Sequence, residues 1–203
     1  AFYKTESGTA QGGVISPLLA NLALHALETD TKEAMLPLLK SYWKKNKNYK
    51  SSRKVLLSNM SIIRYADDFV VLHEDKEIVN RSKEFIEYWL KNIGLELKDS
   101  KTRICHTSDG DNPGFDFLGF NIRQYNVSVH NCGKSKRGFK TLIKPSSKSL
   151  IKHLKVIKDT LRKLRGANQT AVIAKLNPII RGWNQYFCTA VSRKIFEKAA
   201  HQT

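Results

Sequence analysis

Two adjacent carboxylates, Asp67 and Asp68, are the residues of this chain that point most directly to chemistry. They separate two apolar runs, 61–64 and 69–72, and β-branched runs around a short polar break predict a hairpin with the carboxylates at its tip. Adjacent like charges are costly unless a cation neutralises them, and carboxylates are ligands that Mg²⁺ prefers. The pattern predicts a metal platform for phosphoryl or nucleotidyl transfer; the alternative is an ordinary solvated turn.

The hairpin is one of five motif blocks, which span residues 8–21, 65–72, 94–102, 117–120 and 176–187. The second block begins with Tyr65-Ala66-Asp67-Asp68, and the fourth is Phe117-Leu118-Gly119-Phe120. In residue types and order, the five blocks resemble the C-terminal part of a reverse transcriptase/maturase encoded by a group II intron. The resemblance implies an RNA-directed DNA polymerase that also assists intron splicing.

The same resemblance implies roles for individual residues. Asp67 would coordinate catalytic Mg²⁺, and Asp68 would be a second ligand or would orient the first. Tyr65 would lie near the primer end unless it is a core aromatic residue, and Lys101 would contact phosphates unless it is one of many surface lysines. Gln11 and Gly12 would lie against the incoming nucleotide or the template, with a turn-stabilising amide as the alternative for Gln11. Leu118 and Gly119 would approach the primer.

Expected partners follow from the family as well. They are intron RNA, an RNA template with a DNA primer, and deoxynucleoside triphosphates. In this family, the fingers and a first palm strand with another metal-binding Asp precede the block at 8–21. We therefore expect the chain to need an N-terminal fingers and palm portion for catalysis. A non-catalytic RNA-binding maturase, or a reverse transcriptase of another retroelement or a defence system, are the alternatives.

Charge is unevenly distributed along the 203 residues, whose net charge is +17. Residues 1–100 hold 15 basic and 13 acidic side chains, whereas residues 101–203 hold 20 basic and 5 acidic, a net charge of +15. A polyanionic partner accounts for this asymmetry, because cations placed near phosphates release counterions. An anionic membrane surface would also attract it; the polymerase motifs favour nucleic acid.

Periodicity predicts an α+β fold, with helices and strands over residues 1–144 and helices over residues 145–203. The resemblance implies that the first region is a partial reverse-transcriptase palm and that the second is the helical thumb, or maturase domain X. In the palm, helices are predicted near 16–27 and 78–93, the second ending at Gly94, with strands near 95–105 and 115–130. The basic stretch 40–54 is predicted to be either a solvated loop or an RNA-contacting insertion.

The helical region begins with apolar residues at alternating spacings of four and three, from Leu150 to Leu164. A short helix over 169–176 and another that starts at Asn177-Pro178 are expected to follow. The aromatic residues of this last helix either stack on unpaired bases or belong to the core. The candidate RNA-binding residues are cations: Lys152, Lys155, Lys158, Arg162, Lys175 and Arg181.

The remaining composition narrows the function classes. Cys105, Cys132 and Cys188 are far apart and odd in number, so they suggest neither a zinc site nor a disulfide framework. No apolar run is long enough to span a membrane. These features favour a reducing compartment, either a bacterial cytoplasm or an organellar matrix.

Overall fold

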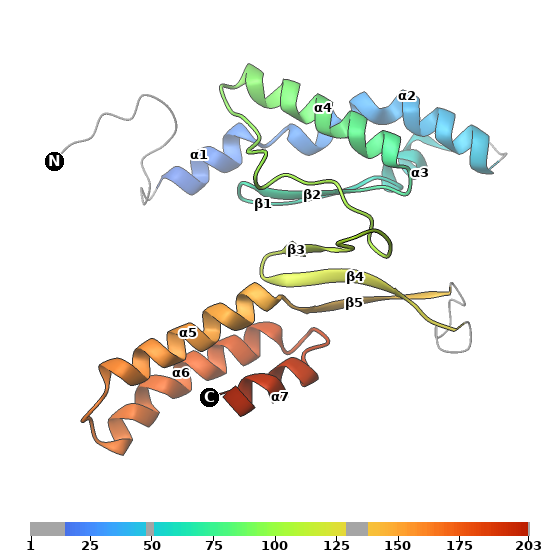
Figure 1. Cartoon of the computed structure of the whole chain (residues 1–203). Coiled ribbons are helices and arrows are strands. Elements are labelled where there is room, and N and C mark those ends of the chain that lie inside the picture. The colour runs from blue at the N-terminus through green and yellow to red at the C-terminus, as the bar shows by residue number, and fades with distance from the viewer. Residues whose placement is uncertain (1–14, 48–50, 129–137, 203) are drawn as a thin grey trace. The chain divides into compact units, whose positions relative to one another are not determined.

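The computed structural model describes residues 15–47, 51–128 and 138–202 (Figure 1). It confirms the predicted α+β class, with small antiparallel sheets and flanking helices. By internal contacts the chain divides into two compact units, 1–104 and 105–203. The predicted boundary between the palm and the thumb, at residues 144 and 145, stays a prediction. Within the described ranges, no helix combines the length and the apolar character that crossing a membrane requires.

The first unit packs helices on a two-stranded hairpin. Its elements are α1 Ser16–Ala23, α2 Leu27–Lys47, α3 Arg53–Ser58, β1 Ser61–Tyr65, β2 Asp68–Leu72 and α4 Lys76–Asn92. Helices α2 and α4 lie side by side on one face of the hairpin (Figure 1). Two buried clusters fill the space between them, one around Leu39, Met60 and Ile62 and one around Leu27 and Ile86.

Helix α4 ends where the sequence predicted. Gly94 follows the last helical residues with φ +73°, a conformation that glycine adopts without steric cost. The Gly94 N–H donates to the Lys91 carbonyl (3.1 Å) and the Leu95 N–H donates to the Leu90 carbonyl (2.9 Å). This pair of bonds is the Schellman arrangement, which satisfies carbonyls that the end of a helix leaves without partners.

Two predictions for this unit, one of a helix and one of a loop, were wrong in their bounds. The helix expected over 16–27 is broken: α1 ends at Ala23, and after a turn α2 begins at Leu27. Leu24 and Leu27 are buried, whereas Leu22 is 72% exposed, so packing selects the residues around the turn and not the regular helical face. The stretch 40–54 is not one loop, because α2 continues to Lys47 and α3 starts at Arg53.

The strand predicted near 95–105 is absent; residues 95–114 form neither helix nor strand. The apolar alternation at Leu95-Glu96-Leu97 is too short to continue, because the chain then turns. The Lys101 N–H donates to the Lys98 carbonyl at 2.9 Å, which closes that turn. A local turn therefore uses backbone groups that a strand would have paired with a neighbour.

The second unit combines an antiparallel sheet with three helices (Figure 1). Its strands follow the order β3 Phe115–Phe117, β4 Phe120–Asn126 and β5 Phe139–Pro145. Its helices are α5 Ser147–Lys163, α6 Gln169–Phe187 and α7 Arg193–Gln202. Helix α5 follows β5 almost directly and begins at the Ser146 cap, whose side chain accepts from the Ser149 N–H.

The break predicted at Asn177-Pro178 does not occur, because α6 runs unbroken from Gln169 to Phe187 with Pro178 inside it. Proline removes one helical hydrogen bond and favours a kink or an end. Beyond it, however, the apolar side of α6 is held by packing: Phe187 is 2% exposed and Trp183 packs on His153 of α5. Tertiary packing therefore overrides the local signal at Pro178.

Candidate active site and nucleic-acid interface

The β1–β2 hairpin carries the two carboxylates as predicted. Tyr65 pairs with Asp68 across the strands, which leaves Ala66 and Asp67 as a two-residue turn. Ala66 has φ +54°, a conformation unusual for a residue with a side chain. Asp67 lies in the turn and Asp68 begins β2, and both side chains are exposed. The catalytic role of the pair remains a prediction; the geometry leaves both carboxylates open to solvent.

Strand alternation explains the exposure of Tyr65. Ile62 is 6% exposed and packs under the helices, so Ile63 and Tyr65 do not share its environment and are 50% and 64% exposed. The alternative of a buried core aromatic at Tyr65 is therefore wrong. The ring stands beside the carboxylate turn, on a strand whose alternate residues are fixed by the core.

Arg64 ties the turn to helix α1, an interaction that the sequence analysis missed. Its guanidinium donates to the Ala66 carbonyl (2.9 Å) and to Asn21 Oδ1 (3.1 Å). The cation thus holds the carbonyl of the residue with positive φ, one position before Asp67. The available signal was a single charge inside an otherwise apolar strand, with no indication of its partner.

The donor chemistry of this tip fits a hard divalent cation. Asp67 and Asp68 offer carboxylate oxygens, the ligands that Mg²⁺ prefers, and both are accessible. Among the described residues, no group of three or more His, Cys, Asp or Glu side chains is arranged to hold a metal. The pair can therefore supply part of a coordination sphere that includes water, substrate phosphates or further ligands.

The other polymerase candidates are placed unevenly. Gln11 and Gly12 lie outside the described residues. Lys101 is exposed in the turn that its own N–H closes onto Lys98. The roles of all three residues stay predictions.

The predicted primer-side residues form the β3–β4 turn. Phe117 pairs with Phe120, so Leu118 and Gly119 are the two turn residues, with φ +50° and +81°. Positive φ at both positions suits the twist of a two-residue hairpin. The Tyr186 hydroxyl donates to the Leu118 carbonyl (3.0 Å), and the Ser146 N–H donates to the Gly119 carbonyl (2.8 Å). Helix α6 and the start of α5 therefore fix this turn.

Aromatic side chains of α6 pack next to this turn, and their burial distinguishes core residues from candidates for base stacking. Phe187 is buried. Trp183 stacks on His153 at 4.4 Å between ring centroids, and its indole N–H donates to Ser149 Oγ (3.3 Å). Burial lowers the pKa of His153 below its ordinary value. Tyr186 differs, since it is 52% exposed.

A groove of about 690 Å³ runs between the β3–β4 turn, α5 and α6. Its lining includes the turn, the half-exposed ring of Tyr186 and the backbone of Gly182, with Lys148 and Lys152 contributing cations. It is assembled from three segments distant in sequence. A flat apolar group with an attached anion matches this combination of surfaces.

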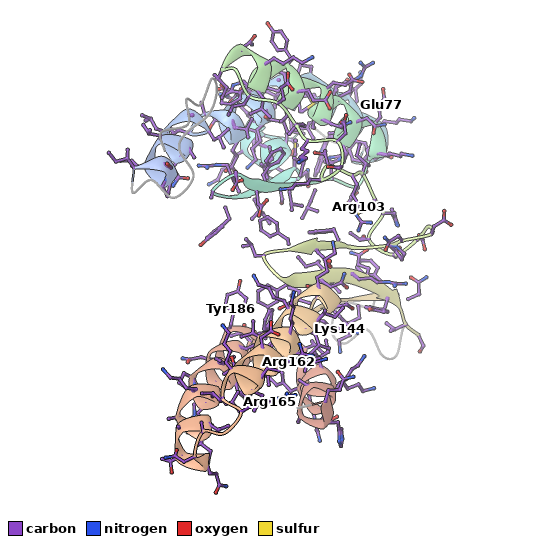
Figure 2. All side chains as sticks on the ribbon, turned by 60° about the vertical axis from the view of Figure 1, so that its left-hand side comes forward. Glu77, Arg103, Lys144, Arg162, Arg165 and Tyr186 are labelled. Atoms are coloured by element: carbon purple, nitrogen blue, oxygen red, sulfur yellow. The ribbon has the colours of Figure 1, made fainter. Side chains whose placement is uncertain are left out.

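The predicted RNA-binding cations are exposed on the helices. Lys152, Lys155, Lys158 and Arg162 are on α5, and Lys175 and Arg181 are on α6. None of these side chains makes an ion pair with a described residue. Beside the C-terminal end of α5, where Arg162 and Arg165 lie (Figure 2), a second groove of about 740 Å³ extends to Gln202 of α7.

Two family models match the chain. The model described as "Reverse transcriptase (RNA-dependent DNA polymerase)" matches residues 1–122, and the model described as "Group II intron, maturase-specific domain" matches residues 150–203. The first contains the carboxylate hairpin and the β3–β4 turn, and the second contains most of α5 and all of α6 and α7.

Curated relatives agree with these matches. "Group II intron-encoded protein LtrA" of Lactococcus lactis subsp. cremoris is 28% identical over 178 residues, covering 67% of this chain and 29% of that protein. "Protein YkfC" of Escherichia coli (strain K12) is 32% identical over 132 residues, covering 60% of this chain and 34% of that protein. "Uncharacterized 91 kDa protein in cob intron" of Schizosaccharomyces pombe is 22% identical over 249 residues, covering 93% and 29%. The chain thus spans about a third or less of each relative.

Proposed function

The chain belongs to the reverse transcriptase family and carries a group II intron maturase domain, and from this premise we propose that it contributes to an RNA-directed DNA polymerase that also binds intron RNA. One observation carries the proposal. An exposed Asp67-Asp68 pair stands at a hairpin tip inside the region that the reverse transcriptase model matches.

Asp67 and Asp68 would hold catalytic Mg²⁺, with Asp67 as ligand and Asp68 as second ligand or orienting group. When bound, Mg²⁺ would neutralise charge that develops on the phosphates during nucleotidyl transfer. This chain's own contribution is the position of the carboxylates: Arg64 holds the Ala66 carbonyl and so restricts the turn that carries Asp67. Tyr65, on the same strand as Arg64, would lie near the primer end.

Further contacts with the substrates are assigned by family resemblance. Gln11 and Gly12 would contact the nucleotide or template, and Lys101 would contact phosphates. Leu118 and Gly119 would face the primer backbone; their positive φ values and their bonds to α6 and α5 support a preformed contact. The template, primer and deoxynucleoside triphosphates are therefore the proposed substrates.

The helical region would bind intron RNA through Lys152, Lys155, Lys158, Arg162, Lys175 and Arg181. Their charges have no described ion-pair partner, so phosphates can use them without first displacing a carboxylate. A bacterial cytoplasm or an organellar matrix is the proposed compartment. The match of residues 150–203 to the maturase-specific domain supports this RNA-binding role.

Catalysis would need an N-terminal portion that supplies another carboxylate and the fingers. The chain spans about a third or less of each curated relative, and the described tip holds only two carboxylates; both observations support this requirement. With a primed RNA template and Mg²⁺, residues 1–203 alone should not extend the primer. Addition of a fingers and palm portion should restore extension.

Asp67→Asn tests the metal assignment in the complemented enzyme. The substitution removes charge and little volume, so DNA synthesis should fall by more than about 100-fold, since even outer-shell partners of metal ligands are worth about 10–100-fold. Asp111→Asn is the matched control, because Asp111 is also exposed and lies outside the hairpin. Near-normal extension by Asp67→Asn would contradict the metal site. Wild-type RNA binding without extension in any combination would favour the non-catalytic maturase.

A further inference from the structure

Gly182 lies inside α6 at a position where no described feature requires glycine. Its φ is not positive, and a Cβ built at this position meets no described atom within 4 Å. Glycine inside a helix is unfavourable relative to alanine, so its presence calls for a packing or a functional reason. The described surroundings give no packing reason. What the missing side chain does provide is open backbone on the floor of the 690 Å³ groove.

Tyr186 lies one helical turn beyond Gly182 and forms the adjacent wall of the groove. Its ring stacks on Phe120, with 5.3 Å between centroids and 27° between planes, while half of the side chain stays exposed. Its hydroxyl bond to the Leu118 carbonyl fixes the ring against the β3–β4 turn. The Tyr186 ring, labelled in Figure 2, is therefore packed against Phe120 and still about half exposed to solvent.

Charge distinguishes the kind of ligand that this surface fits. Lys148 and Lys152 line the groove, are exposed, and make no ion pair with a described residue. The groove's carboxylate, Asp116, accepts a hydrogen bond from the Asn121 amide (2.8 Å). A planar apolar surface, a bare stretch of helix backbone and two free cations together match a planar base joined to a phosphate.

We propose that this groove binds one unpaired nucleotide of RNA, with the base on Tyr186 over Gly182 and its phosphates beside Lys148 and Lys152. The proposal rests on the RNA-binding function above and adds a position that recognises an unpaired base. Bases inside a duplex are stacked on both sides, whereas an unpaired base can offer a free face to Tyr186.

The test uses residues 1–203 and a ten-nucleotide single-stranded RNA that contains one 2-aminopurine. Fluorescence quenching reports stacking, and anisotropy reports affinity. Gly182→Ala should raise the melting temperature, because alanine favours the helix, yet weaken binding about tenfold, the scale of losing one stacked base. Asn184→Ala is the matched control: it improves helix propensity on the same helix outside the groove, so affinity should not change.

Substitutions of the ring separate stacking from structure. Tyr186→Phe keeps the aromatic face and should keep the quenching, whereas Tyr186→Leu should abolish it. A blunt RNA duplex of equal length should bind wild type and Gly182→Ala alike. Unchanged single-strand affinity in Gly182→Ala would overturn the proposal. An equal loss of affinity for the duplex in Gly182→Ala would also overturn it. If Gly182→Ala instead loses self-association and keeps its RNA affinity, the groove binds a second copy of the chain, and the proposal is overturned as well.

The two levels of proposal fail differently. If the wild-type chain binds no RNA at any salt concentration, the RNA-binding function fails and the groove proposal fails with it. If wild type and Gly182→Ala bind the single strand equally, with a steep salt dependence in both, RNA binding stands and only the groove assignment is wrong.

Discussion

Replacing Lys152, Lys155, Lys158 and Arg162 with Gln tests whether the exposed face of α5 binds phosphates. The change lowers the formal net charge from +17 to +13. All four side chains are exposed and have no ion-pair partner among the described residues, so each is free to neutralise one phosphate. The buried side of α5, at Leu150 and Ile157, is untouched, and folding should survive.

The expected magnitude follows from counterion release. Each phosphate neutralised on a single strand contributes about 0.7 to the slope of log affinity against log salt, so losing four lowers the slope by about 2.8. Between about 50 and 200 mM salt, that difference changes the ratio of wild-type to variant affinity about 50-fold. Titration of a labelled single-stranded RNA by fluorescence anisotropy at four salt concentrations measures both slopes.

A second quadruple variant separates local position from total charge. Lys32, Arg81, Lys83 and Arg193 pair with Glu28, Glu84, Glu87 and Glu197, respectively. Replacing these four cations with Gln also gives +13, but it removes charges that neighbouring carboxylates already offset. Its salt slope should stay near wild type. Equal slopes in the two variants would refute the assignment to α5 and attribute RNA binding to overall charge.

Two further predictions address the scaffold that holds the candidate sites. Ile62→Ala should lower the free energy of unfolding by about 2–5 kcal/mol, whereas Ile63→Ala, on the half-exposed neighbour, should cost clearly less; urea denaturation of both tests the orientation of the hairpin. Burial lowers the pKa of His153 in the folded chain. The free energy of unfolding should therefore be highest above the ordinary histidine pKa of about 6.5 and should fall as the pH drops below it. His153→Phe keeps a ring against Trp183 and should flatten that pH dependence, leaving the part due to His73, whose pKa burial also lowers; an unchanged pH profile would contradict the assignment.

The hairpin and the end of α4 were predictable because the required information is local. Two short apolar runs around a short polar break predict a hairpin, and the observed register places Asp67 in its turn. Gly94 likewise marks a position where the backbone needs positive φ. In both cases a few consecutive residues determine the geometry.

Other elements depended on contacts between distant segments. The residues near Pro178 do not indicate that α6 continues, because the stabilising contacts come from α5. The bond from Arg64 to Asn21 joins positions 43 residues apart. The groove around Gly182 requires the β3–β4 turn and two helices at once, so the sequence identified its residues only as separate motifs.

The residues proposed for DNA synthesis and those proposed for RNA binding lie in different halves of the chain, so substitutions can test the two activities separately. The carboxylates lie in the half with a net charge of +2, and the exposed cations of α5 lie in the half with +15. Asp67→Asn changes a metal ligand and leaves every α5 cation in place, so RNA affinity should persist when synthesis is lost. The α5 quadruple variant leaves the hairpin intact, so synthesis should recover at low salt, where fewer phosphate contacts suffice. Loss of both activities in both variants would mean that the metal tip and the basic helix act as one coupled site.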